Sequence, residues 1–251
     1  MCTSIILFRK KNLWPVIIGT NRDERLDRKS LFPNRHWKKK YPNIVGGKDL
    51  EKNGSWIGVN DFGIAAIIHN RKFDKKIDKK KNSRGIIVLE TLKHSSIKEA
   101  LKYISSIDKN NYNGFNLLLA AYNECYWIKH DIKVENLLIK KLDEGLSVIT
   151  DEDLNDKKNR KINFYYELFS DTKIPNPSNN DWNDWIKNLT NTQSNQLKDH
   201  EKICFINKKI NYGTRSSSLI SLPNKKINNK DIVFKSTNSF PTIDSYIDII
   251  F

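Results

Sequence analysis

The sequence has few of the residues that build disulfide frameworks or metal clusters. It contains 3 cysteines and 5 histidines in 251 residues, and the cysteines lie far apart with no Cys-x-x-Cys pair. Disulfide-stapled domains and structural zinc sites both require closely spaced ligands. We therefore expect reduced cysteines, a cytoplasmic protein, no metal site and no required cofactor.

Long apolar runs are missing as well. The run nearest the start, residues 5–8, is interrupted by Arg9, Lys10 and Lys11. A membrane-spanning helix needs about 20 apolar residues, and a leader peptide needs a longer apolar core than this. We expect neither membrane insertion nor export, whereas a hydrophobic content of 38% is sufficient for a full core.

Negative charge is in deficit. The 44 Lys and Arg residues outnumber 29 Asp and Glu, which gives a formal net charge of +15. Such an excess can indicate a nucleic-acid partner. However, the densest basic run, residues 72–81, also carries Asp74 and Asp78, and no helix-turn-helix, zinc finger or aromatic RNA-binding pair accompanies it. We interpret the run as a solvated loop, expect no nucleic-acid partner, and expect the excess charge to favour a small anionic ligand.

Apolar periodicity predicts blocks of strands that alternate with blocks of helices. Strands are expected at residues 3–8, 13–21, 55–60, 64–69, 115–122, 126–130, 134–140, 147–150, 202–206, 217–222 and 231–235, with an ordered loop at 34–52. Helices are expected at residues 84–94, 97–105, 160–169 and 181–189, the second capped by Ser96. This order is typical of helices that cover the outer faces of stacked sheets, and the absence of a linker predicts a single domain over 1–251.

Cys2 has an unusual position for a reactive residue. If Met1 is removed, the chain begins with a cysteine that carries both a thiol and a free α-amine. An α-amine titrates at about pH 7.7–8.0, so it can act as the base for its own thiol. The alternative is that Cys2 is a small apolar residue that opens a strand.

A charged cluster, Asn21-Arg22-Asp23-Glu24-Arg25, ends the strand that is predicted to fold back beside Cys2. A carboxylate near the α-amine would orient it, and a guanidinium group would favour thiolate over thiol. The alternative is a solvated strand end with local salt bridges.

These motifs resemble the NRDE family, also called the Transport and Golgi Organization 2 family. The resemblance begins with Met1-Cys2-Thr3 and Asn21-Arg22-Asp23-Glu24. Further matching segments follow in the family's order at 46–49 (GGKD), 54–59 (GSWIGV), 70–71 (NR), 83–85 (SRG), 112–118 (YNGFNLL) and 212–217 (YGTRSS). The resemblance therefore covers residues 1 to about 220.

The resemblance implies an α+β fold, a four-layer αββα sandwich of the N-terminal nucleophile hydrolase type. It also implies a distant similarity to choloylglycine hydrolases and penicillin V acylases. Cys2 would be nucleophile and base, Asp23 would steady the amine with Arg22 beside it, and Asn70 would donate to an oxyanion. The implied reaction is hydrolysis of a linear amide C–N bond, or of a thioester bond, in a small anionic acyl compound.

Two positions depart from the related patterns. The acylases have an arginine three residues before the aspartate, where this chain has Thr20 and carries its arginine at Arg22 instead. The family pattern places a second asparagine where this chain has Asp151. A carboxylate at that place would oppose an oxyanion rather than stabilise it.

Arginines within the matching segments are predicted to bind a ligand together with Asn21, because guanidinium groups pair well with carboxylates and phosphates. They are Arg71, Arg84 and Arg215. The alternative for each is a structural salt bridge. Trp56, Trp182 and Trp185 are predicted to pack in the core.

The alternative function is a non-catalytic cytosolic carrier of haem or acyl-coenzyme A, because members of the family are implicated in haem trafficking and acyl-coenzyme A metabolism. Cys2 or His69 would then be the iron ligand, although a histidine that ends an apolar strand is commonly a core residue.

Overall fold

The computed structural model describes residues 2–72, 78, 80–227 and 230–251. It divides into two compact units: unit 1 comprises Met1–Arg28 and Asp143–Ile250, and unit 2 comprises Lys29–Leu142 with Phe251. The prediction of a single domain over 1–251 stays a prediction. Most of the basic run at 72–81 lies outside the described residues.

Unit 1 is built on an antiparallel sheet with the strand order β10-β1-β2-β12-β13-β14, and β11 pairs with β12. Its strands are β1 (Thr3–Phe8), β2 (Val16–Arg25), β10 (Gly145–Ile149), β11 (Ile206–Asn207), β12 (Tyr212–Leu222), β13 (Val233–Thr237) and β14 (Tyr246–Asp248). β1 is buried throughout and β2 over its first eight residues. Burial of both faces explains why residues 5–8 of β1 and 16–18 of β2 are continuously apolar rather than alternating.

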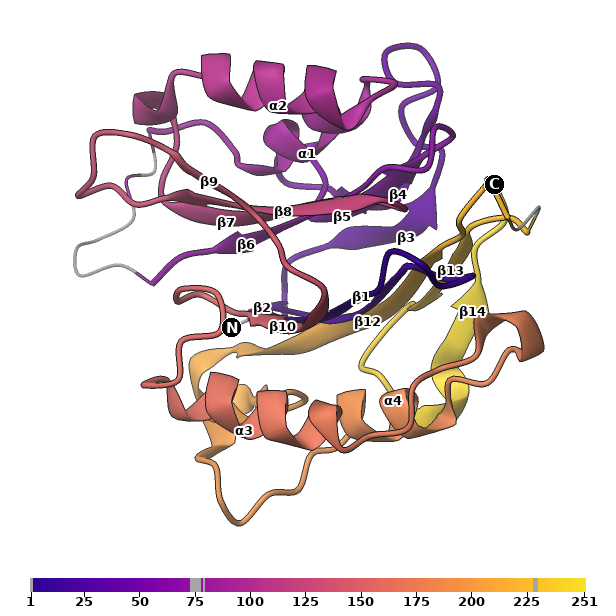
Figure 1. The fold of residues 1–251 in the computed structure, drawn as a ribbon. Helices are drawn as coiled ribbons and strands as arrows, with labels where there is room; N and C mark the ends of the chain where they lie inside the picture. Colours follow the sequence, from indigo (N-terminus) through magenta and orange to yellow (C-terminus); the bar gives the residue numbers. More distant parts are fainter. Residues whose placement is uncertain (1, 73–77, 79, 228–229) are drawn as a thin grey trace. The chain divides into compact units, whose positions relative to one another are not determined.

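Two helices, α3 (Arg160–Ser170) and α4 (Asn183–Leu189), lie along one face of the unit 1 sheet (Figure 1). Trp182 and Trp185 are each 1% exposed within this layer, which confirms that they pack in the core. Gly19 on β2 allows α4 to approach closely, because an added Cβ would lie 2.9 Å from the Leu189 side chain.

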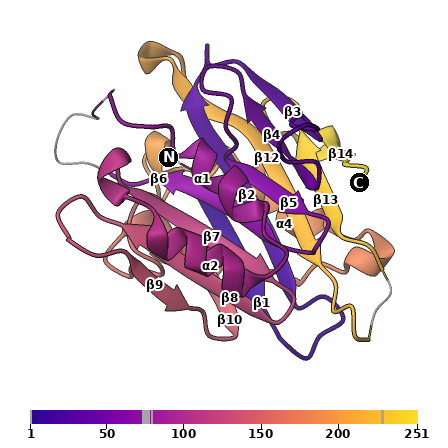
Figure 2. The same cartoon turned by 90° about the horizontal axis from the view of Figure 1, so that it is seen from above.

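Unit 2 is built on a second antiparallel sheet, with the order β3-β4-β5-β6-β7-β8-β9. Its strands are β3 (Ser30–Asn34), β4 (Ile44–Asp49), β5 (Ile57–Asn60), β6 (Ala65–Asn70), β7 (Phe115–Ala121), β8 (Glu124–His130) and β9 (Leu138–Lys141). The helices α1 (Gly85–Leu92) and α2 (Ile97–Ser106) lie across one face of this sheet (Figure 2). Short 3-10 helices connect the elements at Lys109–Asn111, Pro177–Asn179, Asp199–Glu201, Lys208–Ile210 and Ile243–Ser245.

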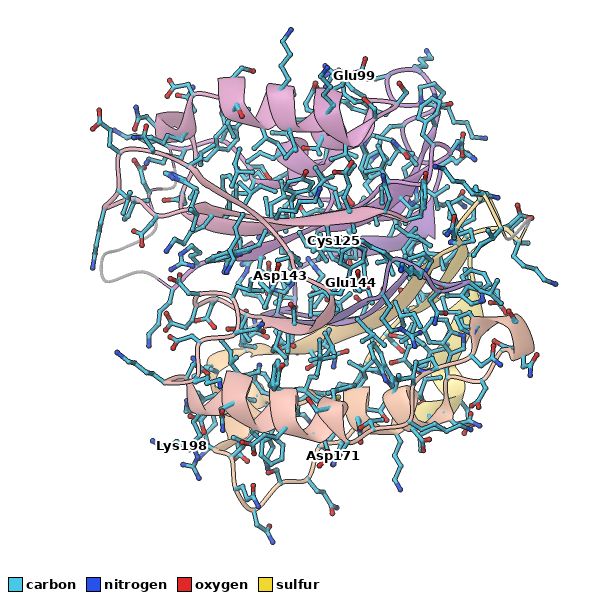
Figure 3. The ribbon with its side chains drawn as sticks, in the orientation of Figure 1. Glu99, Cys125, Asp143, Glu144, Asp171 and Lys198 are labelled. Carbon is cyan, nitrogen blue, oxygen red and sulfur yellow. The ribbon has the colours of Figure 1, made fainter. Side chains whose placement is uncertain are left out.

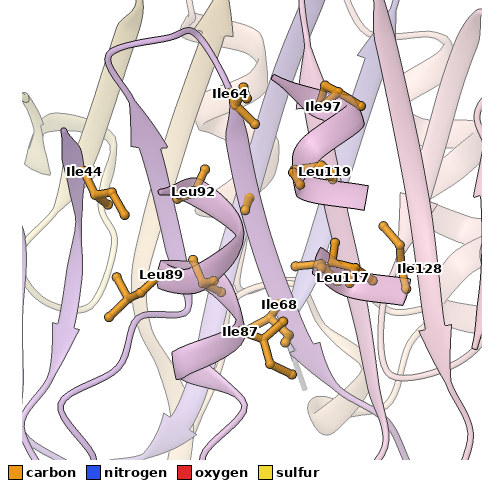
Figure 4. Packing of buried hydrophobic residues seen from close by; sticks show 14 of the residues in the cluster. Ile44, Ile64, Ile68, Ile87, Leu89, Leu92, Ile97, Leu117, Leu119 and Ile128 are labelled. Atoms are coloured by element: carbon orange, nitrogen blue, oxygen red, sulfur yellow. The ribbon is translucent and has the colours of Figure 1, made fainter. Parts of the chain in front are cut away.

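The core of unit 2 forms between its helices and its sheet. Figure 4 shows Leu89 and Leu92 of α1 beside Ile44 of β4, with Leu117 and Leu119 of β7 farther along the sheet. Burial of branched aliphatic side chains of this size stabilises the fold by about 1.5–3 kcal/mol each.

The predicted cap of α2 is confirmed. Ser96 Oγ accepts a hydrogen bond from the backbone N–H of Glu99 at 3.3 Å, and α2 begins at Ile97. Figure 3 shows Glu99 on the side of α2 that faces away from the unit 2 sheet. A cap of this kind satisfies one of the backbone donors that the first helical turn leaves unpaired.

The predicted ordered loop at 34–52 is wrong, because the structure has strand β4 within it. Gly46 and Gly47 suggest a turn by composition, but here they allow close packing: a Cβ on Gly46 would lie 2.6 Å from Ile57 O, and one on Gly47 would lie 2.4 Å from the Trp56 ring. The strand predicted at 202–206 is also wrong over most of its length, since β11 holds only Ile206–Asn207.

None of the helices in the described residues combines the length and the apolar surface that crossing a bilayer would require.

Replacing Gly85 by alanine is expected to destabilise the protein by about 1–3 kcal/mol. The added Cβ would lie 2.9 Å from Ser55 N and 3.1 Å from Gly54 Cα, where two backbone segments touch. Urea unfolding measures the effect. The control is Lys98→Ala on the exposed side of α2, which we expect to change stability by less than about 0.5 kcal/mol. Equal stability of the two variants would contradict the close backbone contact.

Candidate functional site

The β1–β2 hairpin places the first residues of the chain beside the end of β2. Thr3 lies opposite Asn21 in the register, so Cys2 is brought to the next residues of the strand. The backbone N–H of Asp23 donates a hydrogen bond to Cys2 Sγ at 3.3 Å. The structure therefore brings together Cys2 and Asp23, which lie 21 residues apart in the sequence.

The Asp23 carboxylate is buried and held by β12. Asp23 is 3% exposed, and its Oδ1 accepts a hydrogen bond from Thr214 Oγ1 at 2.7 Å. Thr214 Oγ1 also accepts from the backbone N–H of Phe205 at 3.1 Å. The Tyr212 hydroxyl donates to the backbone oxygen of Asp23 at 3.0 Å. Both β12 residues belong to the 212–217 motif, so this motif fixes the end of β2.

The Cys2 thiol is strongly desolvated. Burial raises the pKa of the thiol to about 11, and the neighbouring Asp23 carboxylate contributes in the same direction. Arg22 lowers it, but this is the smallest of the contributions. In the chain described here the thiol is therefore protonated at neutral pH, and nucleophilic chemistry requires a base beside it.

Asn21 and Arg22 lie on opposite faces of β2, because successive strand residues alternate. Asn21 is fully buried, and its Nδ2 donates to Leu189 O at 2.8 Å and Ile203 O at 2.9 Å. This places the Asn21 amide in the interior of unit 1, with both hydrogens donated to carbonyl groups, rather than where a ligand would reach it. Arg22 is 6% exposed, and its Nη2 lies 4.0 Å from Glu24 Oε2.

Lys161 lies in the first turn of α3 and is not among the residues predicted for the site. It is only 7% exposed. The pKa of its ammonium group is lowered, because burial outweighs the smaller raising contributions of Asp23, Asp151 and Cys2. Asp151, just after β10, is also buried, at 5% exposed. A signal was available in the sequence: Lys161 falls on the apolar stripe of α3 at the i, i+4 and i+8 spacing shared with Tyr165 and Phe169.

Arg71 and Arg84 lie in unit 2 around the 112–118 motif. Arg71 Nη1 donates to Asn116 Oδ1 at 3.0 Å, and Arg84 Nη1 donates to Gly114 O at 2.9 Å. Arg71 Nη2 also lies 3.8 Å from an Asp131 carboxylate oxygen. Asn70 is the last residue of β6 and is exposed. These contacts order the strand end, and the predicted ligand-binding role of the arginines stays a prediction.

Arg215 and His69 complete the set of predicted residues. Arg215 lies in unit 1, where the register shifts between Thr214 and Ser216, and its Nε has no hydrogen-bond partner among the described residues. His69 is 3% exposed and lies opposite Asn116 in the register of unit 2. Within the described residues, no group of three or more His, Cys, Asp or Glu side chains is arranged to hold a metal ion.

A comparison with protein-family models matches residues 1–232 to the family described as Transport and Golgi organisation 2. The chain belongs to this family. A comparison with curated proteins found no match.

Solved structures with the same fold as this Transport and Golgi organisation 2 family member are hydrolases. The Caenorhabditis elegans N-acylethanolamine-hydrolyzing acid amidase ortholog is 13% identical with a TM-score of 0.59, covering 99% of this chain and 100% of the amidase. A variant of the conjugated bile acid hydrolase from Clostridium perfringens is 13% identical with a TM-score of 0.55, covering 99% and 92%. Penicillin V acylase from Agrobacterium tumefaciens is 14% identical with a TM-score of 0.51, covering 99% and 86%.

At this level of identity the comparison establishes the fold. The predicted α+β fold of the N-terminal nucleophile hydrolase type is confirmed: the chain contains two antiparallel sheets, and each carries two helices on one face.

Replacing Thr214 by valine is expected to destabilise this family member by about 1–3 kcal/mol. The change removes the donor to Asp23 Oδ1 and the acceptor for the Phe205 N–H, so a buried carboxylate and a buried N–H each lose a partner. Thr214→Ser keeps the hydroxyl and serves as the matched control. Thermal and urea unfolding measure both variants, and similar losses in the two would contradict a role for the hydroxyl.

Proposed function

We propose that this protein is an N-terminal cysteine hydrolase that cleaves a non-peptide amide or thioester bond of a small, anionic acyl compound. The observation that carries the proposal is the hydrogen bond from the Asp23 N–H to Cys2 Sγ, beside the buried Asp23 carboxylate. The fold relatives support the reaction class, because their names include an acid amidase, a bile acid hydrolase and a penicillin acylase.

The proposed activation step is removal of Met1, which converts the amide nitrogen of Cys2 into a free α-amine. A thiol with a pKa of about 11 is a weak nucleophile at neutral pH without a base. An α-amine with a pKa of about 8 on the same residue can accept the thiol proton. The Asp23 carboxylate then stabilises the ammonium group that forms.

The reaction proceeds in two stages. The thiol proton moves to the α-amine as Cys2 Sγ forms a bond to the substrate carbonyl carbon. The C–N or C–S bond to the leaving group breaks, and the α-ammonium returns its proton to that leaving group, which leaves an acyl thioester on Cys2. Water then attacks the thioester carbonyl, gives a proton to the α-amine, and releases the carboxylic acid and the thiol.

Two features support a small anionic acyl substrate. The formal net charge of +15 attracts anions, and the charged residues beside Cys2 include the guanidinium of Arg22. The predicted contribution of Asn70 as an oxyanion donor remains part of this proposal.

A second candidate is the non-catalytic carrier of acyl-coenzyme A or haem. It is favoured by the high pKa of the Cys2 thiol, which keeps the sulfur protonated if Met1 stays in place. The protein would then bind such a ligand without turning it over. A coenzyme A thioester that raises Tm, or a Soret band on haem titration, supports this candidate.

Cys2→Ala is expected to lower turnover by about 1,000-fold or more, because removal of a covalent nucleophile leaves only binding and electrostatic contributions. Hydrolysis of a panel of N-acyl amides and acyl-coenzyme A thioesters measures the effect, with intact mass to detect an acyl adduct. Cys125→Ala is the matched thiol control, since Cys125 is buried on β8 of unit 2. Unchanged turnover in Cys2→Ala ends the hydrolase proposal.

Alkylation of Cys2 by iodoacetamide is expected to depend on the state of the N-terminus. With Met1 in place, the rate should rise with pH toward a midpoint near 11, because the thiolate reacts and burial raises the thiol pKa. With Met1 removed, the midpoint should fall to lower pH as the α-amine takes the proton. Peptide mass spectrometry measures the rate at each pH. Identical midpoints in the two forms would show that the amine does not act as the base.

A further inference from the structure

Asn21 donates both hydrogens of its side-chain amide to backbone carbonyl groups. It is fully buried on β2, and its Nδ2 lies 2.8 Å from Leu189 O and 2.9 Å from Ile203 O. Leu189 ends α4, and the last carbonyl groups of a helix have no partner within the helix. Ile203 follows the connecting segment 190–202. A single amide therefore holds both ends of this segment against β2.

The short segment 203–205 is fixed by hydrogen bonds from three elements. The Ile203 N–H donates to the Tyr165 hydroxyl of α3 at 2.7 Å, and Ile203 O accepts from Asn21. The Phe205 N–H donates to Thr214 Oγ1 at 3.1 Å, and Phe205 O accepts from the Thr214 N–H at 2.8 Å. The backbone groups at both ends of the segment are therefore paired, although the segment belongs to no strand.

The contacts of this segment lead to the Asp23 carboxylate. A threonine hydroxyl carries one hydrogen and can accept as well as donate. Thr214 Oγ1 accepts from the Phe205 N–H and donates its own hydrogen to Asp23 Oδ1, 2.7 Å away. Asn21 and Asp23 lie two residues apart on β2 and share a face. A chain of contacts thus runs from Asn21 through the segment 203–205 and Thr214 to the carboxylate beside Cys2.

We propose that Asn21 is a positioning residue for Asp23: through the segment 203–205 it holds the Thr214 hydroxyl in place against the carboxylate that stabilises the Cys2 α-ammonium. This rests on the proposed N-terminal cysteine hydrolase. It gives Asn21 a role in the Asn21-Arg22-Asp23-Glu24 motif that requires no contact with a ligand, in place of the predicted ligand binding.

The proposal fixes the direction of the effect on Cys2. The hydrogen bond from Thr214 draws part of the negative charge of Asp23 toward the hydroxyl. If the segment loosens, this hydrogen bond weakens and the carboxylate acts more strongly on the thiol and the α-amine. A nearby negative charge favours the protonated form of each, so the pH midpoint of Cys2 alkylation should rise by about 0.5 pH unit or more.

Other charged or titratable groups interact electrostatically with Asp23 or Cys2. They come from β2, α3, the segment 203–205 and β12, and they are Arg22, Lys161, Tyr165, Cys204 and Tyr212. The variants below leave these groups in place, apart from Tyr165→Phe. Burial raises the pKa of the Tyr165 hydroxyl, so this variant removes an uncharged group and leaves the charges around Asp23 as they are.

The experiment measures the pH midpoint of Cys2 alkylation by iodoacetamide in protein that lacks Met1, together with hydrogen exchange of residues 203–206 and Tm. Asn21→Ala releases the segment from β2, and Tyr165→Phe releases it from α3. Each is also combined with Thr214→Val. We expect both single variants to raise the midpoint and to speed exchange. Where turnover is present, kcat should fall about 10-fold with KM nearly unchanged, because Asn21 does not touch the substrate.

The matched control is Asn60→Ala in unit 2. Asn60 is also fully buried, and its Nδ2 donates to Leu92 O at 2.7 Å and His94 O at 2.9 Å, at the end of α1. Its removal costs hydrogen bonds of the same kind, so Tm should fall while the Cys2 midpoint stays unchanged. Tyr166→Phe is the control for Tyr165→Phe, since it removes a hydroxyl from the next, half-buried residue of α3.

Raised midpoints in Asn21→Ala and Tyr165→Phe that add nothing to the effect of Thr214→Val support the proposal. A lower Tm with an unmoved or lowered midpoint would show that Asn21 is merely structural and overturn it. A full further shift in the Thr214→Val background would also overturn it, because the effect would bypass Thr214.

If Asn21→Ala does not fold, Tyr165→Phe alone and combined with Thr214→Val decides in the same way. The midpoint is read without any substrate, so the two proposals fail separately. Midpoints that shift as expected in a protein without turnover would uphold the role of Asn21 while refuting the hydrolase.

Discussion

The neutralisation of the buried Asp23 carboxylate is the constraint on which the rest of unit 1 depends. A carboxylate at 3% exposure is destabilising unless donors and cations surround it. Here the donor is Thr214 on β12, whose hydroxyl lies 2.7 Å from Asp23 Oδ1. Segments that lie up to 191 residues apart in the sequence are therefore drawn to one point.

The strand order of unit 1 also restrains the first residues of the chain, which lie beside Asp23. β1 lies between β10 and β2, and β2 lies between β1 and β12, so the first residues of the chain belong to the interior of a sheet rather than to its edge. A chain terminus is ordinarily among the most mobile parts of a protein. Pairing on both sides of β1 suppresses that motion and keeps Cys2 within hydrogen-bonding distance of Asp23.

Local patterns predicted much of the fold. The β1–β2 hairpin follows from two continuous apolar runs joined by a basic turn, and the start of α2 follows from Ser96 and Glu99. Both features are decided by residues close together in sequence. β4 was missed because Gly46 and Gly47 allow close packing against Ile57 and Trp56, which only the folded sheet brings near.

The candidate site was predictable only in part, for the same reason. Cys2 and Asp23 are related through a single hairpin, so strand pairing alone places them together. The side-chain donor to Asp23 is Thr214, which lies 191 residues away on β12, so no local pattern joins the two residues. A lysine on an apolar stripe was a visible anomaly, but its partners depend on how α3 packs against the sheet.

The departure at Thr20, where the acylases have an arginine, can be interpreted from the face of β2 on which each side chain lies. Thr20 and Arg22 lie two residues apart on β2, and strand side chains repeat every two residues, so they share one face. On that face Thr20 Oγ1 meets Ser4 Oγ at 2.7 Å, where a short hydroxyl suits the close pairing of β1 and β2. An arginine moved from position 20 to position 22 therefore keeps its face and comes closer along β2 to Cys2, whose thiol it influences.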